Sequence, residues 1–277
     1  MKKICIFLFF ILLCFYITNK LTDSLKEKDP LMQEIKKEEE KYSIKPVNAE
    51  IIDDEIISGK NGQTINYQKT YQNMKQYGTY NESLIVTKEV KPTISITENY
   101  DKYLIRGNKS KRQVALVFPI IEKEEIESII NILEKNNIKG TFFIDGTFLE
   151  KNISLLLKYP NYEYEILSYN KTYDVNFFKT SISYLESITK KDSKYCYTEN
   201  TNEELLNLCK KIKLHTIKPT LIVKNNLLRH VKSNLSNGEI ISIIPNSYTK
   251  KELETTIDYI KGKNYDLVLL ETLLSEI

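Results

Sequence analysis

The sequence lacks tryptophan and contains few histidines (two), glycines (eight), prolines (seven) and alanines (two) among its 277 residues. It also lacks a glycine-rich phosphate loop, a Cys-x-x-Cys pair and a G-x-S-x-G motif, and so shows none of these nucleotide-binding, redox or serine-hydrolase signatures. Forty lysines and arginines nearly balance 37 aspartates and glutamates along the chain, so nothing indicates nucleic-acid binding. Hydrophobic residues make up 41% of the chain, which is sufficient for a packed core.

The N-terminus carries the apolar run of a secretory signal or a signal anchor. Lys2 and Lys3 precede uninterrupted apolar residues from Ile4 to Ile17. The run is short for a membrane span, which needs about 20 residues, and no A-x-A cleavage site follows it. We expect an uncleaved, single-pass cell-membrane anchor over residues 1–18, with the globular part outside the cytoplasm. Cleavage of the signal followed by secretion is the alternative.

Two segments separate this anchor from the main domain. Residues 19–60 are dense in charge and show little apolar periodicity, which predicts a charged linker or stalk. Residues 61–112 predict a small pre-domain, in which Tyr67, Tyr71 and Met74 share one face of a short helix that ends near Gly78. The apolar runs at 84–86 and 93–96 are typical of short strands.

From residue 113 onward, short apolar runs alternate with amphipathic patterns. The apolar runs predict strands at 114–118, 141–144, 166–167, 216–217, 239–244 and 267–270. The patterns between them predict helices at 126–133, 149–159, 177–188, 203–211 and 250–261, and Thr201-x-x-Glu204 is a capping-box candidate for one of them. The alternation indicates parallel strands with helical crossovers, so a (β/α) barrel and an open doubly wound sheet both fit. In either fold, chemistry belongs at the C-terminal ends of the strands.

Two of the four cysteines, Cys196 and Cys209, lie in this region. A disulfide between them is possible in an oxidising compartment, and two separate thiols are the alternative, because spacing alone does not decide between them.

Several segments of residues 113–277 resemble the polysaccharide deacetylase (NodB-homology) family. VALVF at 114–118 and ILEKNNIKGTFFI at 132–144, with Gly146 after it, are similar to the family motifs VALTFDDGP and LKKNNIKATFFVxG. The tail at 238–244 and 264–270 also matches. The resemblance implies a distorted (β/α) barrel that removes acetyl groups from glycans. It also implies a divalent metal held by one Asp and two His, a neighbouring Asp as base and a C-terminal His as acid.

The chain departs from the family at the metal and base positions. The Asp-Asp pair of the family is replaced by Pro119 and Ile120, whose side chains neither bind a metal nor accept a proton. The two histidines of the H-x-x-x-H motif are replaced by Tyr169 and Tyr173. A neutral phenol, with a pKa of about 10, is a poor ligand beside imidazole.

The remaining family motifs are also altered. The RxPYG motif reads Lys194-Tyr195-Cys196-Tyr197-Thr198, and the Leu-His position of the acid reads Ile244-Pro245. We therefore predict that the chain holds no metal or cofactor and is not an active deacetylase.

Other polar residues have simpler interpretations. His215 and His230 lie 15 residues apart, match none of the family's ligand positions and are expected to be ordinary polar or surface histidines. Asp145 follows a predicted strand and is interpreted as a turn or helix cap, with sugar binding as the alternative. Asp174 is expected to cap the helix that begins near Val175.

Three functions remain open. The first is an inactive deacetylase-like protein, anchored in the membrane, that binds cell-envelope glycan through Tyr169, Tyr173, Tyr195, Tyr197 and Asp145. The second is a structural or partner-binding envelope protein whose pocket is closed by Pro119, Ile120 and Pro245. The third is an active carbohydrate deacetylase with relocated residues such as Asp145 or His215. A pocket filled by side chains favours the second, and a water-filled groove lined by tyrosines favours the first.

Overall fold

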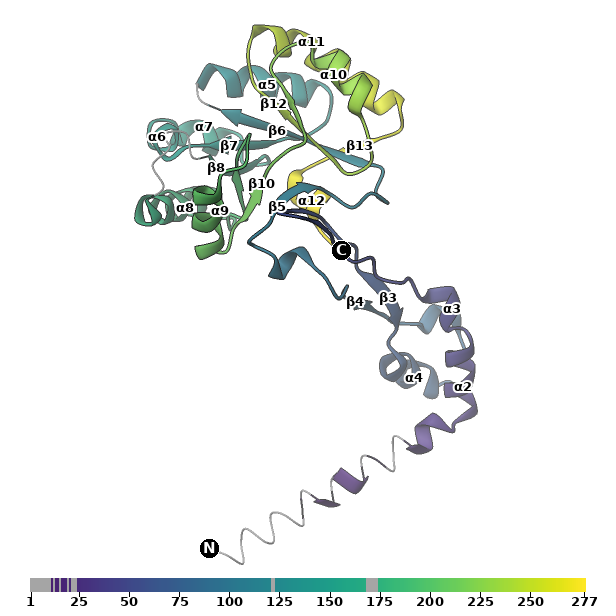
Figure 1. Ribbon diagram of the computed structural model, residues 1–277. Coiled ribbons are helices and arrows are strands. Elements are labelled where there is room, and N and C mark those ends of the chain that lie inside the picture. The colour runs from purple at the N-terminus through teal and green to yellow at the C-terminus, as the bar shows by residue number, and fades with distance from the viewer. Residues whose placement is uncertain are drawn as a thin grey trace, which may run out of the picture. The chain divides into compact units, whose positions relative to one another are not determined.

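The computed structural model describes residues 11, 13–14, 16–18, 20, 24–120, 123–167 and 174–277 (Figure 1). These residues fall into two compact units, Met1–Pro46 with Asn61–Lys91 and Val47–Lys60 with Pro92–Ile277. In the described part of the chain, no helix is both long and apolar enough to cross a membrane. Most of the predicted anchor lies outside the described residues.

The smaller unit is built from helices and a two-stranded antiparallel sheet. Its elements are α2 (Pro30–Lys37), α3 (Glu39–Tyr42), β3 (Gly62–Ile65), α4 (Tyr67–Lys75), η1 (Glu82–Leu84) and β4 (Thr87–Val90). Met32 and Ile35 of α2 are buried with Tyr71 and Met74 of α4. The predicted helical face of α4 is confirmed, and Gly78 follows it with a φ of +69°.

The larger unit holds the remaining elements. Its strands are β1 (Glu50–Ile52), β2 (Glu55–Ile57), β5 (Tyr103–Arg106), β6 (Gln113–Ile120), β7 (Thr141–Ile144), β8 (Glu163–Leu167), β9 (Tyr195–Tyr197), β10 (His215–Ile217), β11 (Leu221–Val223), β12 (Glu239–Ile243) and β13 (Asp266–Val268). Its helices are η2 (Ile96–Glu98), α5 (Lys123–Lys135), α6 (Gly146–Lys151), α7 (Ile153–Lys158), α8 (Val175–Thr189), α9 (Glu203–Lys211), α10 (Leu227–Asn234), α11 (Ser247–Gly262) and α12 (Leu270–Leu274).

Among the described residues, seven strands form a closed ring in the order β5-β10-β9-β8-β7-β6-β12. The pairs from β10 round to β12 are parallel, as is the pair of β5 with β10. The ring closes where β5 meets β12 in antiparallel orientation, with Arg106 opposite Glu239. The predicted distorted barrel is therefore confirmed, and the open sheet is excluded.

Alternate residues of β6 belong to two different hydrophobic clusters. Val114, Leu116 and Phe118 pack with the helices outside the barrel, whereas Ala115 and Val117 pack inside it. The outer cluster includes the apolar stripe of α5, namely Ile126, Ile129, Ile130 and Leu133, as the sequence pattern predicts. Figure 1 shows the helices arranged around the strands of this unit.

The short helix α12 covers the N-terminal end of the barrel. Its residues Leu270, Leu273 and Leu274 are fully buried in the inner cluster. The backbone N–H of Leu270 donates to the hydroxyl of Thr141, and the N–H of Glu271 donates to the carboxylate of Glu163. Because Thr141 and Glu163 are the first residues of β7 and β8, this end of the barrel is closed.

Several sequence-based predictions need correction. The predicted linker at 19–60 contains α2, β1 and β2, and residues 47–60 belong to the larger unit rather than to a separate stalk. The run at 84–86 forms the end of η1 and the residues after it, and the run at 93–96 leads into η2, so neither is a strand. Helix 149–159 is divided into α6 and α7. The N-cap of α9 is Asn202, whose side chain accepts from Leu205 N, rather than Thr201.

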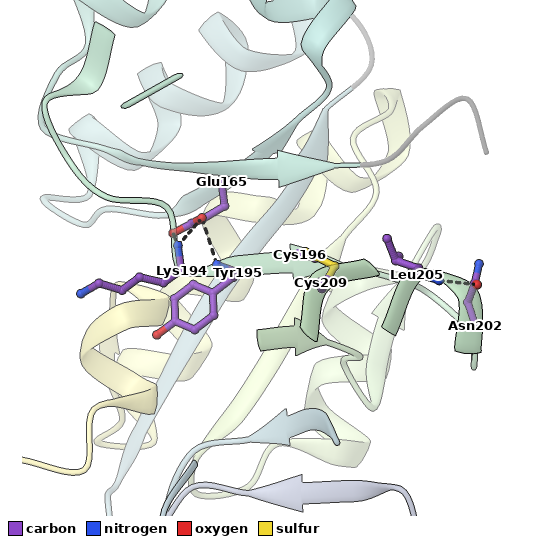
Figure 2. The surroundings of a disulfide bond; sticks show 7 residues. All are labelled: Glu165, Lys194, Tyr195, Cys196, Asn202, Leu205 and Cys209. Atoms are coloured by element: carbon purple, nitrogen blue, oxygen red, sulfur yellow. Dashed lines mark hydrogen bonds between the residues drawn. A yellow bond between two sulfur atoms is a disulfide. The ribbon is translucent and has the colours of Figure 1, made fainter. Parts of the chain in front are cut away.

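Cys196 of β9 and Cys209 of α9 form a disulfide (Figure 2). Both cysteines are buried in the outer cluster, so the bond joins a barrel strand to the helix that covers it. Of the two alternatives that the spacing left open, the structure therefore has the disulfide and not two separate thiols.

Candidate functional site

The C-terminal end of β6 carries the residues that replace the family's Asp-Asp pair. Pro119 pairs with Phe143 and Ile120 with Ile144 on β7, while the pairing with β12 ends at Val117. A proline without an N–H is tolerated where one side of the strand is no longer paired. Ile120 is fully buried in the outer cluster. This end of the strand therefore presents no ligand and no proton acceptor.

Tyr197, at the end of β9, fills the interior of the barrel. Its hydroxyl lies 2.6 Å from the hydroxyl of Ser242 on β12, a strand that is not a neighbour of β9 in the ring. Its ring packs against Phe143, with the ring centroids 5.1 Å apart. Burial raises the pKa of Tyr197. The phenol is therefore neutral, and its only polar atom is satisfied by the hydrogen bond across the barrel.

The two other described positions at this end also have structural roles. Pro245 is buried directly after β12 and precedes Asn246, the N-cap of α11. Asp145 follows β7 and caps α6, because its carboxylate accepts from the backbone N–H of Phe148 at 2.5 Å. The interpretation of Asp145 as a helix cap is confirmed, and Asp174 caps α8 in the same way.

Tyr195 and Glu165 lie deeper, near the start of β9 (Figure 2). The Glu165 carboxylate is buried and accepts from the backbone N–H groups of Lys194 and Tyr195 at 3.1–3.2 Å. Burial, together with the nearby carboxylate of Glu163, raises the pKa of Glu165 well above its usual value. Burial also raises the pKa of Tyr195, whose side chain is only 4% exposed. These groups hold strands together rather than face a ligand.

Tyr169 and Tyr173 lie outside the described residues. In the part of the chain that is described, no three His, Cys, Asp or Glu side chains gather in a way that could hold a metal ion. The side chains at the end of β6 do not fit the metal centre that the family resemblance implies, and Pro245 after β12 does not fit its catalytic acid. Asp145 lies after the last residue of β7 and His215 is the first residue of β10, at opposite ends of the barrel, so the structure does not bring them together.

His215 is buried near the closed end of the barrel. Its ring stacks on Tyr100 with centroids 4.3 Å apart, and its Nδ1 has no hydrogen-bond partner among the described residues. Burial lowers the pKa of His215 to about 4. It is therefore a neutral core histidine, whereas His230 is exposed on α10, as the sequence predicts for a surface position.

Acid should destabilise the protein through His215. Its folded pKa lies below the unfolded value of about 6.5, so the unfolded state binds more protons between these two values. The resulting loss of stability from pH 7 to pH 4 should reach about 3 kcal/mol and be absent in His215→Phe. Urea unfolding at both pH values measures this loss of stability, with His230→Gln as the exposed control.

Two buried carboxylates act in the opposite direction. Because Glu163 and Glu165 have raised pKa values, they favour the folded state at low pH, so only the difference between variant and wild type isolates His215. Equal pH dependence in wild type and His215→Phe would contradict the assignment.

Sequence reasoning missed two residues of this region. Ser242 was part of an apolar strand pattern, and only the closed ring places it opposite Tyr197. Glu165 sits between Tyr164 and Ile166 in an apolar run. Glu163 and Glu165 alternate with Tyr164 and Ile166 in β8, and this period of two was the available signal that both acids lie on one face of the strand.

Comparisons with known proteins agree with the fold. No protein-family model matches the sequence. Over 272 residues the chain is 26% identical to the uncharacterized protein YlxY of Bacillus subtilis (strain 168), covering 90% of this chain and 85% of that protein.

Solved structures extend this likeness. Wild-type BA3943 of Bacillus anthracis, described as a CE4 family pseudoenzyme, is similar with a TM-score of 0.67 and 24% identity over 90% of this chain and 96% of that one. A BA3943 mutant described as having restored enzymatic activity matches with the same TM-score and identity, over 90% of this chain and 99% of that one. PdaA of Bacillus subtilis, a family 4 carbohydrate esterase, is similar with a TM-score of 0.55 and 18% identity over 65% of this chain and 87% of that one. The larger unit therefore has the fold of CE4 polysaccharide deacetylases.

Proposed function

We propose that this chain is a non-catalytic deacetylase-like protein of the cell envelope that binds glycan at the C-terminal end of its barrel. The main evidence for the loss of catalysis is that Pro119 and Ile120, both buried, stand at the end of β6. Neither side chain offers an oxygen or nitrogen atom to a metal or a proton. The likeness to BA3943, itself described as a pseudoenzyme, supports the same conclusion.

Three of the predicted residues, Asp145, Tyr169 and Tyr173, remain as glycan contacts in this proposal. Tyr195 and Tyr197 are only 4% and 3% exposed, and their rings fill the barrel rather than line a groove. Asp145 is partly exposed, and Tyr169 and Tyr173 follow β8 in the sequence. Aromatic rings and a carboxylate are suited to the faces and hydroxyls of a sugar.

A second candidate is a partner-binding envelope protein with a closed pocket. The burial of Pro119, Ile120 and Pro245, with Tyr197 bonded across the barrel to Ser242, favours it. This candidate shares the loss of catalysis and differs in the ligand, so a glycan-binding measurement separates the two.

Location outside the cytoplasm is part of the proposal. Disulfides persist in oxidising compartments, and the bond between Cys196 and Cys209 supports such a location. The apolar run of residues 4–17 supports anchoring in the membrane, with secretion as the alternative.

One set of measurements on the full chain tests the function. We expect no stoichiometric zinc, no metal-dependent acetate release from N-acetylated cell-wall glycan, and saturable co-sedimentation with that glycan. Tyr169→Ala with Tyr173→Ala should weaken co-sedimentation about tenfold, a loss of about 1.4 kcal/mol. Tyr184→Ala, a partly exposed tyrosine on α8, is the matched control.

The outcomes separate the candidates. Stoichiometric zinc or metal-dependent acetate release would overturn the loss of catalysis. Absence of glycan binding, with catalysis also absent, would favour the closed, partner-binding protein.

A further inference from the structure

Lysines gather where β9 and β10 begin. The chain reads Lys190-Lys191-Asp192-Ser193-Lys194 before β9 and Lys210-Lys211-Ile212-Lys213 before β10. Because β9 and β10 are parallel neighbours, paired from His215 opposite Tyr195, the two segments meet at one edge of the barrel. The backbone confirms this, since His215 N–H donates to the carbonyl of Lys194 at 2.9 Å.

A groove of about 430 Å³ lies between α8 and these two segments. Lys179 of α8, Lys211 at the end of α9 and Lys213 in the following turn all line it. Its apolar lining includes Ile182 and Leu214, which are largely buried. Its volume is within the range of small-molecule sites, about 300–1,000 Å³.

Among the described residues that line this groove, three lysines face one carboxylate, that of Glu186. Among the described residues, Lys179, Lys211 and Lys213 take part in no ion pair, whereas Lys194 pairs with Glu271 and Lys210 with Asp101. Three ammonium groups from α8 and from the segment before β10, against one carboxylate, leave the groove with a net positive charge that favours an anion.

Glu186 and Ser193 are two further polar residues of the groove. Glu186, the carboxylate that lines it, accepts from the backbone N–H of Ser193 at 3.0 Å. The Ser193 hydroxyl oxygen is buried, and no described residue serves as its hydrogen-bond partner. A buried hydroxyl without a partner costs free energy that a bound oxyanion, accepting its proton in a hydrogen bond, would recover.

We propose that this groove binds a phosphate group of a polyanionic ligand. Phosphate presents several acceptor oxygens on one centre, and lysine ammonium groups bind it as point charges from different directions. Lys190 and Lys191, exposed beside the groove, extend the positive surface along a chain of such groups. The groove lies at the N-terminal ends of β9 and β10, opposite the proposed glycan site, so the two sites are independent.

Calorimetric titration of the full chain with inorganic polyphosphate tests the proposal, with inorganic phosphate and acetate as single-group probes. We expect saturable binding of polyphosphate that weakens with added salt, and weaker binding of phosphate that still exceeds that of acetate. Lys211→Glu with Lys213→Glu should weaken polyphosphate binding by about tenfold or more. Ser193→Ala should weaken phosphate binding about tenfold, because one hydrogen bond to a charged acceptor is lost.

The matched control is Lys250→Glu with Lys251→Glu on α11, which makes the same change in net charge away from the groove and breaks no ion pair of the described chain. It should leave the affinity within about twofold of wild type. An equal loss in both double variants would show a non-specific charge effect and overturn the site, as would the absence of polyphosphate binding. Binding to vesicles of anionic lipid without binding to polyphosphate would show that the ligand of this groove is a membrane surface and not a phosphate polymer, and would overturn the proposal. Tyr169→Ala with Tyr173→Ala should leave polyphosphate binding unchanged, which distinguishes failure of this site from failure of the glycan site.

Discussion

Removal of the disulfide by Cys196→Ala with Cys209→Ala should destabilise the larger unit by about 3 kcal/mol. The bond closes a short loop, with a sequence separation of 13 residues, and ties β9 to α9. Without it the unfolded chain gains conformational freedom, and the buried contacts of the two sulfur atoms are also lost. Urea unfolding of the oxidised wild type and the double variant measures the difference in the free energy of unfolding.

Two controls make this result specific. Cys14→Ser changes an exposed cysteine outside the pair and should leave the stability unchanged. Under denaturing conditions without reductant, two of the four cysteines should react with a thiol reagent, and all four should react after reduction. Equal stability of wild type and double variant, or four reactive thiols before reduction, would show that the bond is not formed.

The second large effect is expected at the point where the barrel closes. Gly238 precedes β12 with a φ of +75°, and its carbonyl accepts from the N–H of Gly107 at 2.8 Å. A Cβ at Gly238 would lie 2.3 Å from the carbonyl oxygen of Gly107, and backbone atoms cannot move aside as a flexible side chain can. Next to this contact, Arg106 pairs with the buried carboxylate of Glu239. Gly238→Ala should therefore displace β5 from β12.

We expect Gly238→Ala to lower the free energy of unfolding by about 2–5 kcal/mol, the combined cost of a positive φ for alanine and of the steric clash. Gly262→Ala at the end of α11 is the control, because a Cβ there would meet no described atom within 4 Å. It should be neutral or stabilise by up to about 1 kcal/mol. Urea unfolding measures both variants, and a Gly238→Ala protein as stable as wild type would mean that the barrel does not close at this contact.

The alternation of apolar runs and amphipathic patterns predicted most elements of the larger unit. Strand 141–144 and helix 203–211 have the predicted bounds, because each combines a clear period with a distinct start. Strand β5 was not predicted, since Tyr103–Arg106 is a short run between charged residues. Its role depends on pairing with β10 and β12, which are distant in the sequence.

In the candidate site, too, some features were readable in the sequence and others depended on contacts between distant strands. Replacement of the family's Asp-Asp pair by Pro119 and Ile120 is readable in the sequence, because a residue without a donor atom cannot acquire one through folding. Whether Tyr195 and Tyr197 line a groove was not readable. Their burial follows from the closure of the ring, which places Ser242 and Phe143 against Tyr197.

By itself, the sequence determined which chemical groups this protein possesses, and therefore that the deacetylase family's Asp-Asp pair is replaced at the end of β6 and its catalytic acid at the end of β12. The tertiary structure alone decided which groups meet. Cys196 reaches Cys209, Tyr197 reaches Ser242, and Lys179 of α8 lines one groove with Lys211 and Lys213. The reason is physical: composition and period act locally along the chain, whereas closing a barrel brings together side chains whose separation in sequence carries no signal of their contact.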